Sequence, residues 1–131
     1  QARRVEMMAA QRLDLVVAVM PEHVEYMSGH RWDHRFAPLV ALAADGTCVL
    51  VCPDKAPAEA AAHDVRVYDA KWRSTLRNDQ REAAAAILGD WLAGRPLGRV
   101  GVEFSACPPH VTGRLGSASL ADIEPSLFAM R

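Results

Sequence analysis

The hydrophobic pattern is clearest between Leu13 and Gly29, where a nearly unbroken apolar run is followed by an amphipathic segment. Three valines lie within residues 15–20, and β-branched side chains favour a strand over a helix. An apolar run without alternating polar positions is typical of a strand buried on both faces. Pro21 ends this run and suits the first turn of a helix, for which Gly29 provides a stop. We therefore predict a central strand followed by a short helix.

The rest of the chain alternates between helical and extended patterns. Helices are predicted over residues 3–12, 56–63, 80–93, 108–115 and 125–131, and strands over residues 39–42, 47–52, 65–68, 100–104 and 119–123. Asp45-Gly46 predicts a hairpin, because glycine accepts the positive φ of the turn. Asn78 or Asp79 is expected to cap the helix over 80–93, after an irregular segment over 71–77. The pattern predicts a single α/β domain, residues 1–131, with a mixed β-sheet flanked by helices.

Composition narrows the class of protein. The 131 residues are 50% hydrophobic and 24% charged, with a formal charge of -1, which is ordinary for one soluble domain and argues against a nucleic-acid binder. No apolar run approaches membrane-spanning length, so no membrane association is expected. The three cysteines show no CxxC spacing, which favours a reducing, cytoplasmic setting. Cys48 and Cys52 should share one face of a strand with Leu50, as small buried hydrophobes.

The most chemically dense hexapeptide is His30-Arg31-Trp32-Asp33-His34-Arg35, directly after the predicted strand and helix. Functional groups often collect at the carboxyl end of a central strand, so we expect any site of this chain to lie here. His30 and His34 have the spacing of a helical zinc pair, but the glutamate base and a third ligand are missing. Two solvent-facing histidines are the favoured interpretation.

Other catalytic patterns have little support. The chain contains no GxGxxG, GxxxxGK[ST] or GxSxG motif. Asp14 and Glu103 lie at or beside predicted strands and could bind Mg²⁺ as in ribonuclease H-like nucleases. Further acids with suitable spacing are missing, so a structural role at the strand ends is the better hypothesis for both carboxylates.

A series of short motifs runs through the whole chain. They are Leu13-Asp14, Tyr26-Met27-Ser28-Gly29, the Asp45-Gly46 hairpin, Val100-Gly101-Val102-Glu103, and the ending from Leu120-Ala121-Asp122-Ile123 to Arg131. In this order, and with the arginine-rich helix before them, the chain resembles the N-terminal domain of the creatinase, prolidase and aminopeptidase P family. Two positions depart from the family's pattern: His23 replaces a common asparagine, and His30 replaces an aromatic residue after the glycine.

This resemblance implies a mixed sheet with a ribonuclease H-like motif and a non-catalytic role. In that family a C-terminal pita-bread domain holds two divalent metal ions (Mn, Co or Zn) through two Asp, one His and two Glu. We therefore expect these ligands beyond Arg131, in a bacterial relative of Xaa-Pro dipeptidases, aminopeptidases P or creatinase-like C–N hydrolases. The implied partners are the protein's own catalytic domain, a second subunit of a homodimer, and a small peptide or amidino-type substrate.

By position, the loop after Gly29 is the part that the resemblance places near the partner's active site. Arg31 and Arg35 could hold a substrate carboxylate, and Trp32 could wall an apolar or cationic group. With His34, these are the predicted substrate-contacting residues; no catalytic or metal-binding residue is predicted in the domain. The alternative for Trp32 is packing against its own domain.

A second class of function is a stand-alone interaction or regulatory module with the same fold. Such a module would lack the catalytic half and should then expose a contiguous apolar patch. The residues expected in that patch are Phe36, Leu127, Phe128 and Met130.

Overall fold

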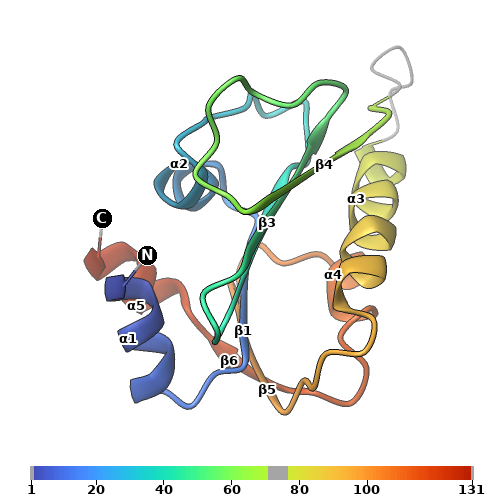
Figure 1. Ribbon diagram of the computed structural model, residues 1–131. Helices are drawn as coiled ribbons and strands as arrows, with labels where there is room; N and C mark the ends of the chain where they lie inside the picture. The colour runs from blue at the N-terminus through green and yellow to red at the C-terminus, as the bar shows by residue number, and fades with distance from the viewer. Residues whose placement is uncertain (1, 71–76, 131) are drawn as a thin grey trace.

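The computed structural model describes residues 2–70 and 77–130 and shows a β-sheet with helices on both faces (Figure 1). The helices are α1 (Ala2–Ala10), α2 (Pro21–Ser28), α3 (Arg77–Leu92), α4 (Pro109–Thr112) and α5 (Glu124–Met130). The strands are β1 (Leu15–Ala18), β2 (Leu39–Ala43), β3 (Cys48–Pro53), β4 (Asp64–Tyr68), β5 (Arg99–Val102) and β6 (Ser119–Asp122). The predicted α/β class, with a mixed sheet in a single domain, is confirmed.

β1 lies in the interior of the sheet, as its unbroken apolar sequence predicts. The strand order is β4-β3-β2-β1-β5-β6. β1 pairs antiparallel with β2 and parallel with β5, while β4 and β6 add parallel strands at the two edges. β1 therefore has an antiparallel neighbour on one side and a parallel neighbour on the other, as β3 also does. Crevices at the carboxyl ends of parallel strands, such as β1 and β5, are common binding sites.

Two hydrophobic cores lie on opposite faces of the sheet. Leu15 and Val17 face a core covered by α3 and α4, whereas Val16 and Ala18 face one covered by α1, α2 and α5 (Figure 1). All four side chains are buried. Because successive residues of a strand point to opposite faces, burial on both sides requires an apolar residue at every position.

The turn from β1 into α2 follows the predicted chemistry. Pro21 occupies the first turn of α2. Backbone N–H groups in the first turn of a helix have no intrahelical acceptor, so proline, which lacks this group, is tolerated there. Gly29 caps the helix with φ 81°, in the left-handed region, and its N–H donates to the carbonyl of Glu25. The strand and the helix are both confirmed, although the strand ends at Ala18 rather than at Met20.

The hairpin between β2 and β3 also matches its prediction. Gly46 has φ 92°, and the Asp45 carboxylate accepts hydrogen bonds from the backbone N–H and hydroxyl of Thr47, at 2.9 and 2.6 Å. Cys48 and Cys52 share one core with Leu50, as predicted. Burial raises the pKa of Cys52 to about 11, which keeps this thiol protonated at neutral pH.

The longest helix, α3, begins earlier than predicted. It starts at Arg77, so Asn78 and Asp79 lie in its first turn rather than at its cap. Residues 71–76 of the predicted irregular segment lie outside the described residues. Leu88 and Trp91 of α3 are buried in the core between this helix and the sheet. Ala84 and Ala85 are buried in the same core, and their small side chains let α3 pack close to the sheet.

Several further sequence predictions are wrong in detail. Residues 56–63 form bends and irregular backbone rather than a helix, because so short a segment is only marginally helical on its own. β5 ends at Val102, and Phe104 is 58% exposed in the following turn. The helix predicted over 108–115 is shorter in the structure, where α4 spans Pro109–Thr112.

No helix in the described part of the chain is both long enough and apolar enough to cross a membrane.

Candidate functional site

A buried polar junction ties the carboxyl ends of β1 and β5 together. Glu103, the first residue after β5, is fully buried, and its carboxylate accepts hydrogen bonds from the backbone N–H groups of Val19 and Met20. The Met20 N–H lies 3.1 Å from both carboxylate oxygens. The Nδ1 atom of His23, in the first turn of α2, lies 2.5 Å from Oε2 of the same carboxylate. We refer to Val19, Met20, His23 and Glu103 as the polar junction.

Burial is the main influence on the electrostatics of this junction. It raises the pKa of Glu103, while hydrogen bonds from Val19, His23 and Met20 act in the opposite direction. The His23 ring is also fully buried, and its Nε2 atom has no hydrogen-bond partner among the described residues. The ring instead meets Phe128 of α5 edge to face, with centroids 4.8 Å apart. The junction therefore holds β1, α2, β5 and α5 together.

The sequence indicates the role of Glu103 better than that of His23. The structural role predicted for the two strand-end carboxylates is confirmed, since Asp14 accepts hydrogen bonds from the backbone N–H groups of Gly98 and Arg99, at 2.7 and 3.1 Å. His23 was not predicted as a functional residue. The available signal was its replacement of the asparagine that is common at this position in the family that the chain resembles.

The predicted site residues lie together in one exposed segment, which we call the basic loop (residues 30–35). The side chains of Arg31, His34 and Arg35 are 52%, 85% and 69% exposed. Arg31 lies 3.4 Å from the carboxylates of both Glu22 and Glu25 on α2. These long, exposed contacts are weak, so the guanidinium of Arg31 can turn toward another anion with little loss of stability.

Asp33 organises the turn at the tip of the basic loop. Its carboxylate accepts from the backbone N–H of Arg35 at 2.9 Å and from the Arg35 side chain at 3.1 Å. These hydrogen bonds, the backbone one first, together with the nearby charges of Arg35 and His34, lower the pKa of Asp33. Arg35 is thereby oriented by a fixed anion, while most of its side chain stays in solvent.

Trp32 differs from its neighbours because it is partly buried. It packs against the core beneath α1, α2 and α5, and the centroid of its ring lies 4.5 Å from the centroid of the His30 ring. His30 and His34 lie in non-helical backbone, so the spacing of a helical zinc pair does not apply. Within the described ranges, no group of three or more His, Cys, Asp or Glu residues could hold a metal ion.

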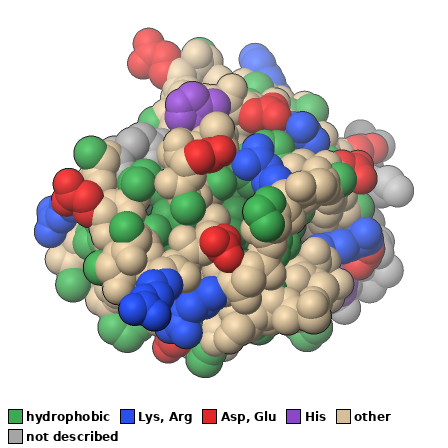
Figure 2. Space-filling view, turned by 60° about the horizontal axis from the view of Figure 1, so that its bottom comes forward, with side chains coloured by type: hydrophobic (Ala, Val, Ile, Leu, Met, Phe, Trp, Pro, Cys, Tyr) green, Lys and Arg blue, Asp and Glu red, His purple; other side chains and the backbone are tan. Residues whose placement is uncertain are grey.

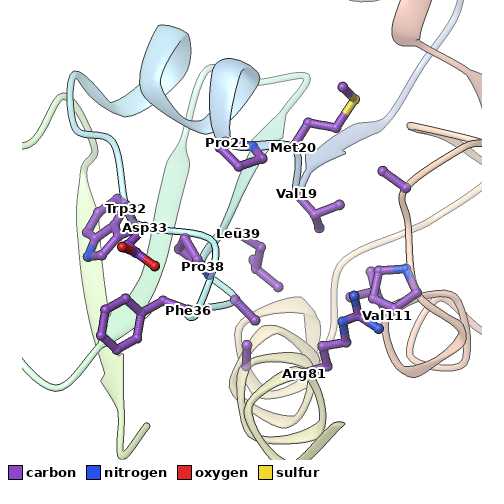
Figure 3. A pocket seen from close by; sticks show the side chains of 14 residues that line it. Val19, Met20, Pro21, Trp32, Asp33, Phe36, Pro38, Leu39, Arg81 and Val111 are labelled. Atoms are coloured by element: carbon purple, nitrogen blue, oxygen red, sulfur yellow. The ribbon is translucent and has the colours of Figure 1, made fainter. Parts of the chain in front are cut away.

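A cavity of about 170 Å³ lies between the basic loop and the carboxyl end of β1 (Figure 3). Its walls come from the turn after β1, from residues 32–39, from α3, and from the segment that leads into α4. Trp32 and Asp33 line one side, while Arg81 of α3 and Val111 of α4 lie across from them (Figure 3). The polar junction is adjacent through Val19 and Met20, which line the same cavity.

The apolar patch predicted for a module without its catalytic half is contradicted by the described residues, since Leu127 is buried and Phe36 and Met130 are partly buried. Leu127 is fully buried in the core beneath α5, and Phe36 packs against the opposite core and lines the cavity. Phe128 is 45% exposed but contacts the His23 ring. On the face seen in Figure 2, acidic and basic side chains are interspersed with apolar and neutral ones.

The comparisons with known proteins agree with this architecture. The model of the Creatinase/Prolidase N-terminal domain family matches residues 2–131. A crystal structure of a proline dipeptidase from Streptococcus pneumoniae is similar with a TM-score of 0.75 and 17% identity, covering 99% of this chain and 95% of that one. The N-terminal domain of the cytoplasmic peptidase PepQ from Mycobacterium tuberculosis gives a TM-score of 0.69 at 17% identity, with 97% and 94% coverage.

A longer protein is similar over part of its length. The prolidase from Pyrococcus horikoshii gives a TM-score of 0.67 at 15% identity; the match covers 97% of this chain but 33% of the prolidase. A search of curated protein sequences found no match. At these identities the solved structures show a shared fold, and the match to the family model over nearly the whole chain identifies the family.

Proposed function

Because the chain belongs to the creatinase/prolidase N-terminal domain family, we propose that it is the non-catalytic N-terminal domain of an Xaa-Pro peptidase or creatinase-like metallohydrolase. In this proposal the domain supports a homodimer and shapes the substrate entrance of the active site formed by the catalytic domain. The observation that carries the proposal is the pairing of a buried polar junction with an exposed basic loop that directly follows α2, the helix that carries His23 of the junction.

The basic loop has the chemistry that recognition of a short peptide needs. A peptide substrate ends in a carboxylate, and a guanidinium binds a carboxylate with two parallel hydrogen bonds. Arg31 and Arg35 are exposed on a loop whose tip is held by Asp33. Trp32 offers a flat apolar face beside them, and His34 adds an exposed donor. We assign these four residues to contact with the substrate, at the mouth of the active site of the second subunit.

The metal ions belong elsewhere in this proposal. The described residues offer no donor set for a metal ion, so they do not fit the two divalent ions of such hydrolases. We place the Mn, Co or Zn ions in the catalytic domain. The domain alone should then hydrolyse no Xaa-Pro dipeptide and hold no stoichiometric metal after chelation. Elemental analysis and a peptidase assay on the same sample test this; turnover with one equivalent of bound metal would contradict it.

The decisive experiment measures kinetics in a protein that joins this domain to a catalytic domain. Arg31→Ala and Trp32→Ala should lower kcat/KM for an Xaa-Pro dipeptide by about tenfold to hundredfold, because a lost arginine–carboxylate contact costs about 1.5–3 kcal/mol. Metal content and melting temperature should stay normal. Arg99→Gln, which removes an exposed arginine at the opposite end of the sheet, is the matched control.

The alternative outcome is equally clear. If Trp32 serves only to pack against its own domain, Trp32→Ala will lower the melting temperature while the remaining enzyme keeps normal kcat/KM. Unchanged kinetics in both variants would remove the basic loop from the substrate entrance. The oligomeric state of the joined protein, measured by sedimentation, tests the homodimer separately.

A further inference from the structure

The cavity beside β1 has the size and stiffness of a preformed ligand site. Its volume of about 170 Å³ is close to that of an apolar cavity of about 150 Å³ that binds benzene in another protein. Three prolines, Pro21, Pro38 and Pro108, form part of the wall. Proline side chains have little rotational freedom, so little conformational entropy is lost when a ligand enters. A single ring or a branched aliphatic group therefore fits this space.

One side chain gives the cavity its charge preference. Among the described residues, Arg81 is the only cationic residue that lines the cavity, and it makes no hydrogen bond or ion pair with another described residue. The other charged lining residue, Asp33, is already engaged by Arg35 at 3.1 Å. The guanidinium of Arg81 rises from α3 toward the α4 side of the cavity, beside the apolar wall (Figure 3). An apolar wall raises the strength of any charge pair formed next to it.

We propose that this cavity binds a compact organic monocarboxylate. The apolar body of the ligand fills the space between Val19, Leu39 and Val111, and its carboxylate pairs with Arg81. The cavity lies at the carboxyl end of β1, which is parallel to β5, and ligands of α/β proteins commonly bind beyond the carboxyl ends of parallel strands. The assignment concerns Arg81 and the apolar wall rather than the exposed arginines of the basic loop, so it stands independently of the proposed function.

Benzoate is a suitable probe, and two related compounds separate the parts of the recognition. Benzamide has the same size without the charge, and acetate has the charge without the ring. Titrations followed by amide chemical shifts should place benzoate among residues 19–21, 36–39 and 106–111. Benzamide and acetate should each bind at least about tenfold more weakly, since each lacks one half of the interaction.

Two variants and a control test the residues. Arg81→Gln should weaken benzoate binding at least about tenfold, the change in affinity expected for the loss of one charge-assisted hydrogen bond. Benzamide binding should stay unchanged. Ala106→Leu, at a partly exposed position of the cavity wall, should reduce binding of both aromatic compounds by filling the space. Arg99→Gln should bind benzoate like the wild-type chain. Thermal melts of each variant establish that it is folded.

Several results would overturn the assignment. Equal affinity for benzoate and benzamide would remove Arg81 from recognition, and so would unchanged benzoate binding by a folded Arg81→Gln variant. Shifts that map to the basic loop alone, or benzoate binding that survives a folded Ala106→Leu variant, would place the ligand outside the cavity. None of these results affects the expected loss of kcat/KM in Arg31→Ala, which tests the role of the basic loop at the substrate entrance. The two proposals are therefore judged separately.

Discussion

The basic loop directly follows α2, the helix that carries His23 of the polar junction, yet burial gives the charged groups of the junction and the loop different roles. In the junction, His23 and Glu103 are fully buried and lie 2.5 Å apart. In the basic loop, Arg31 is 52% exposed and lies 3.4 Å from its carboxylates. A buried charge must be paired where it is, whereas an exposed one can exchange water or a neighbour for a new partner. The junction is therefore suited to structure and the loop to recognition.

The loop is not independent of the core, because its base is anchored. The hydroxyl of Tyr68 accepts from the backbone N–H of Ala37 at 2.9 Å and donates to Gln80 at 3.0 Å. The Gln80 amide in turn donates to the carbonyl of Arg35 at 2.9 Å. The exposed side chains of the loop thus project from a backbone that β4 and α3 hold in place, which restricts where the arginines can reach.

The largest effect is expected from breaking the strand on which both regions depend. Val17 is fully buried in β1, opposite Ala41 of β2 and Val102 of β5. Val17→Asp would bury a carboxylate without a partner and should abolish stable folding. Circular dichroism and thermal unfolding measure this, with Val17→Ala as a milder core control. A Val17→Asp variant that melts cooperatively near the wild-type temperature would contradict the placement of β1.

Removing the carboxylate of the junction should have the next largest effect. Glu103→Ala leaves the N–H groups of Val19 and Met20 and the His23 ring without their acceptor, and should lower the free energy of unfolding by about 3–5 kcal/mol. Glu103→Gln keeps one acceptor oxygen and should cost less. Urea unfolding distinguishes the two variants. A loss below about 1 kcal/mol for Glu103→Ala would show that the junction contributes little to stability.

The anchor of the loop predicts a pH dependence at the alkaline end. Burial raises the pKa of Tyr68 to about 12, whereas an unfolded tyrosine titrates near its ordinary pKa of about 10. The folded chain therefore binds this proton more tightly, so stability is full below pH 10 and falls between about pH 10 and 12. The loss should be on the order of 2 kcal/mol. Tyr68→Phe should lack this part of the pH dependence in urea unfolding measured at successive pH values.

The smallest stability change is expected in the basic loop. Arg35→Ala removes an ion pair with Asp33 that lies in solvent, and should leave the midpoint of urea unfolding close to that of the wild-type chain. The same urea titration measures it, with Arg66→Ala, which removes a partly buried ion pair with Asp64 on β4, for comparison. A loss above about 2 kcal/mol would show that the loop is part of the folded core, and the contrast with the junction would then fail.

Local sequence determined the elements whose burial follows from composition. The valine run required a strand buried on both faces, Pro21 and Gly29 bounded α2, and Asp45-Gly46 required the hairpin turn. These features depend on residues that are neighbours in the chain, so pattern and backbone chemistry were sufficient. The ordered motifs also indicated the family, which the match over residues 2–131 confirms. The grouping of Arg31, Trp32, His34 and Arg35 was predictable because they are adjacent in sequence.

Only the tertiary structure decided which charged groups are buried and what they contact. His23 and Glu103 are 80 residues apart, and no local pattern pairs them. Arg81 and Trp32 line one cavity although they come from α3 and from the basic loop. Phe104 continues an apolar strand pattern but is exposed, because β5 ends two residues earlier, while Leu127 becomes buried beneath α5. Contacts between distant segments depend on how the sheet and its helices pack, and that information is spread over the whole chain.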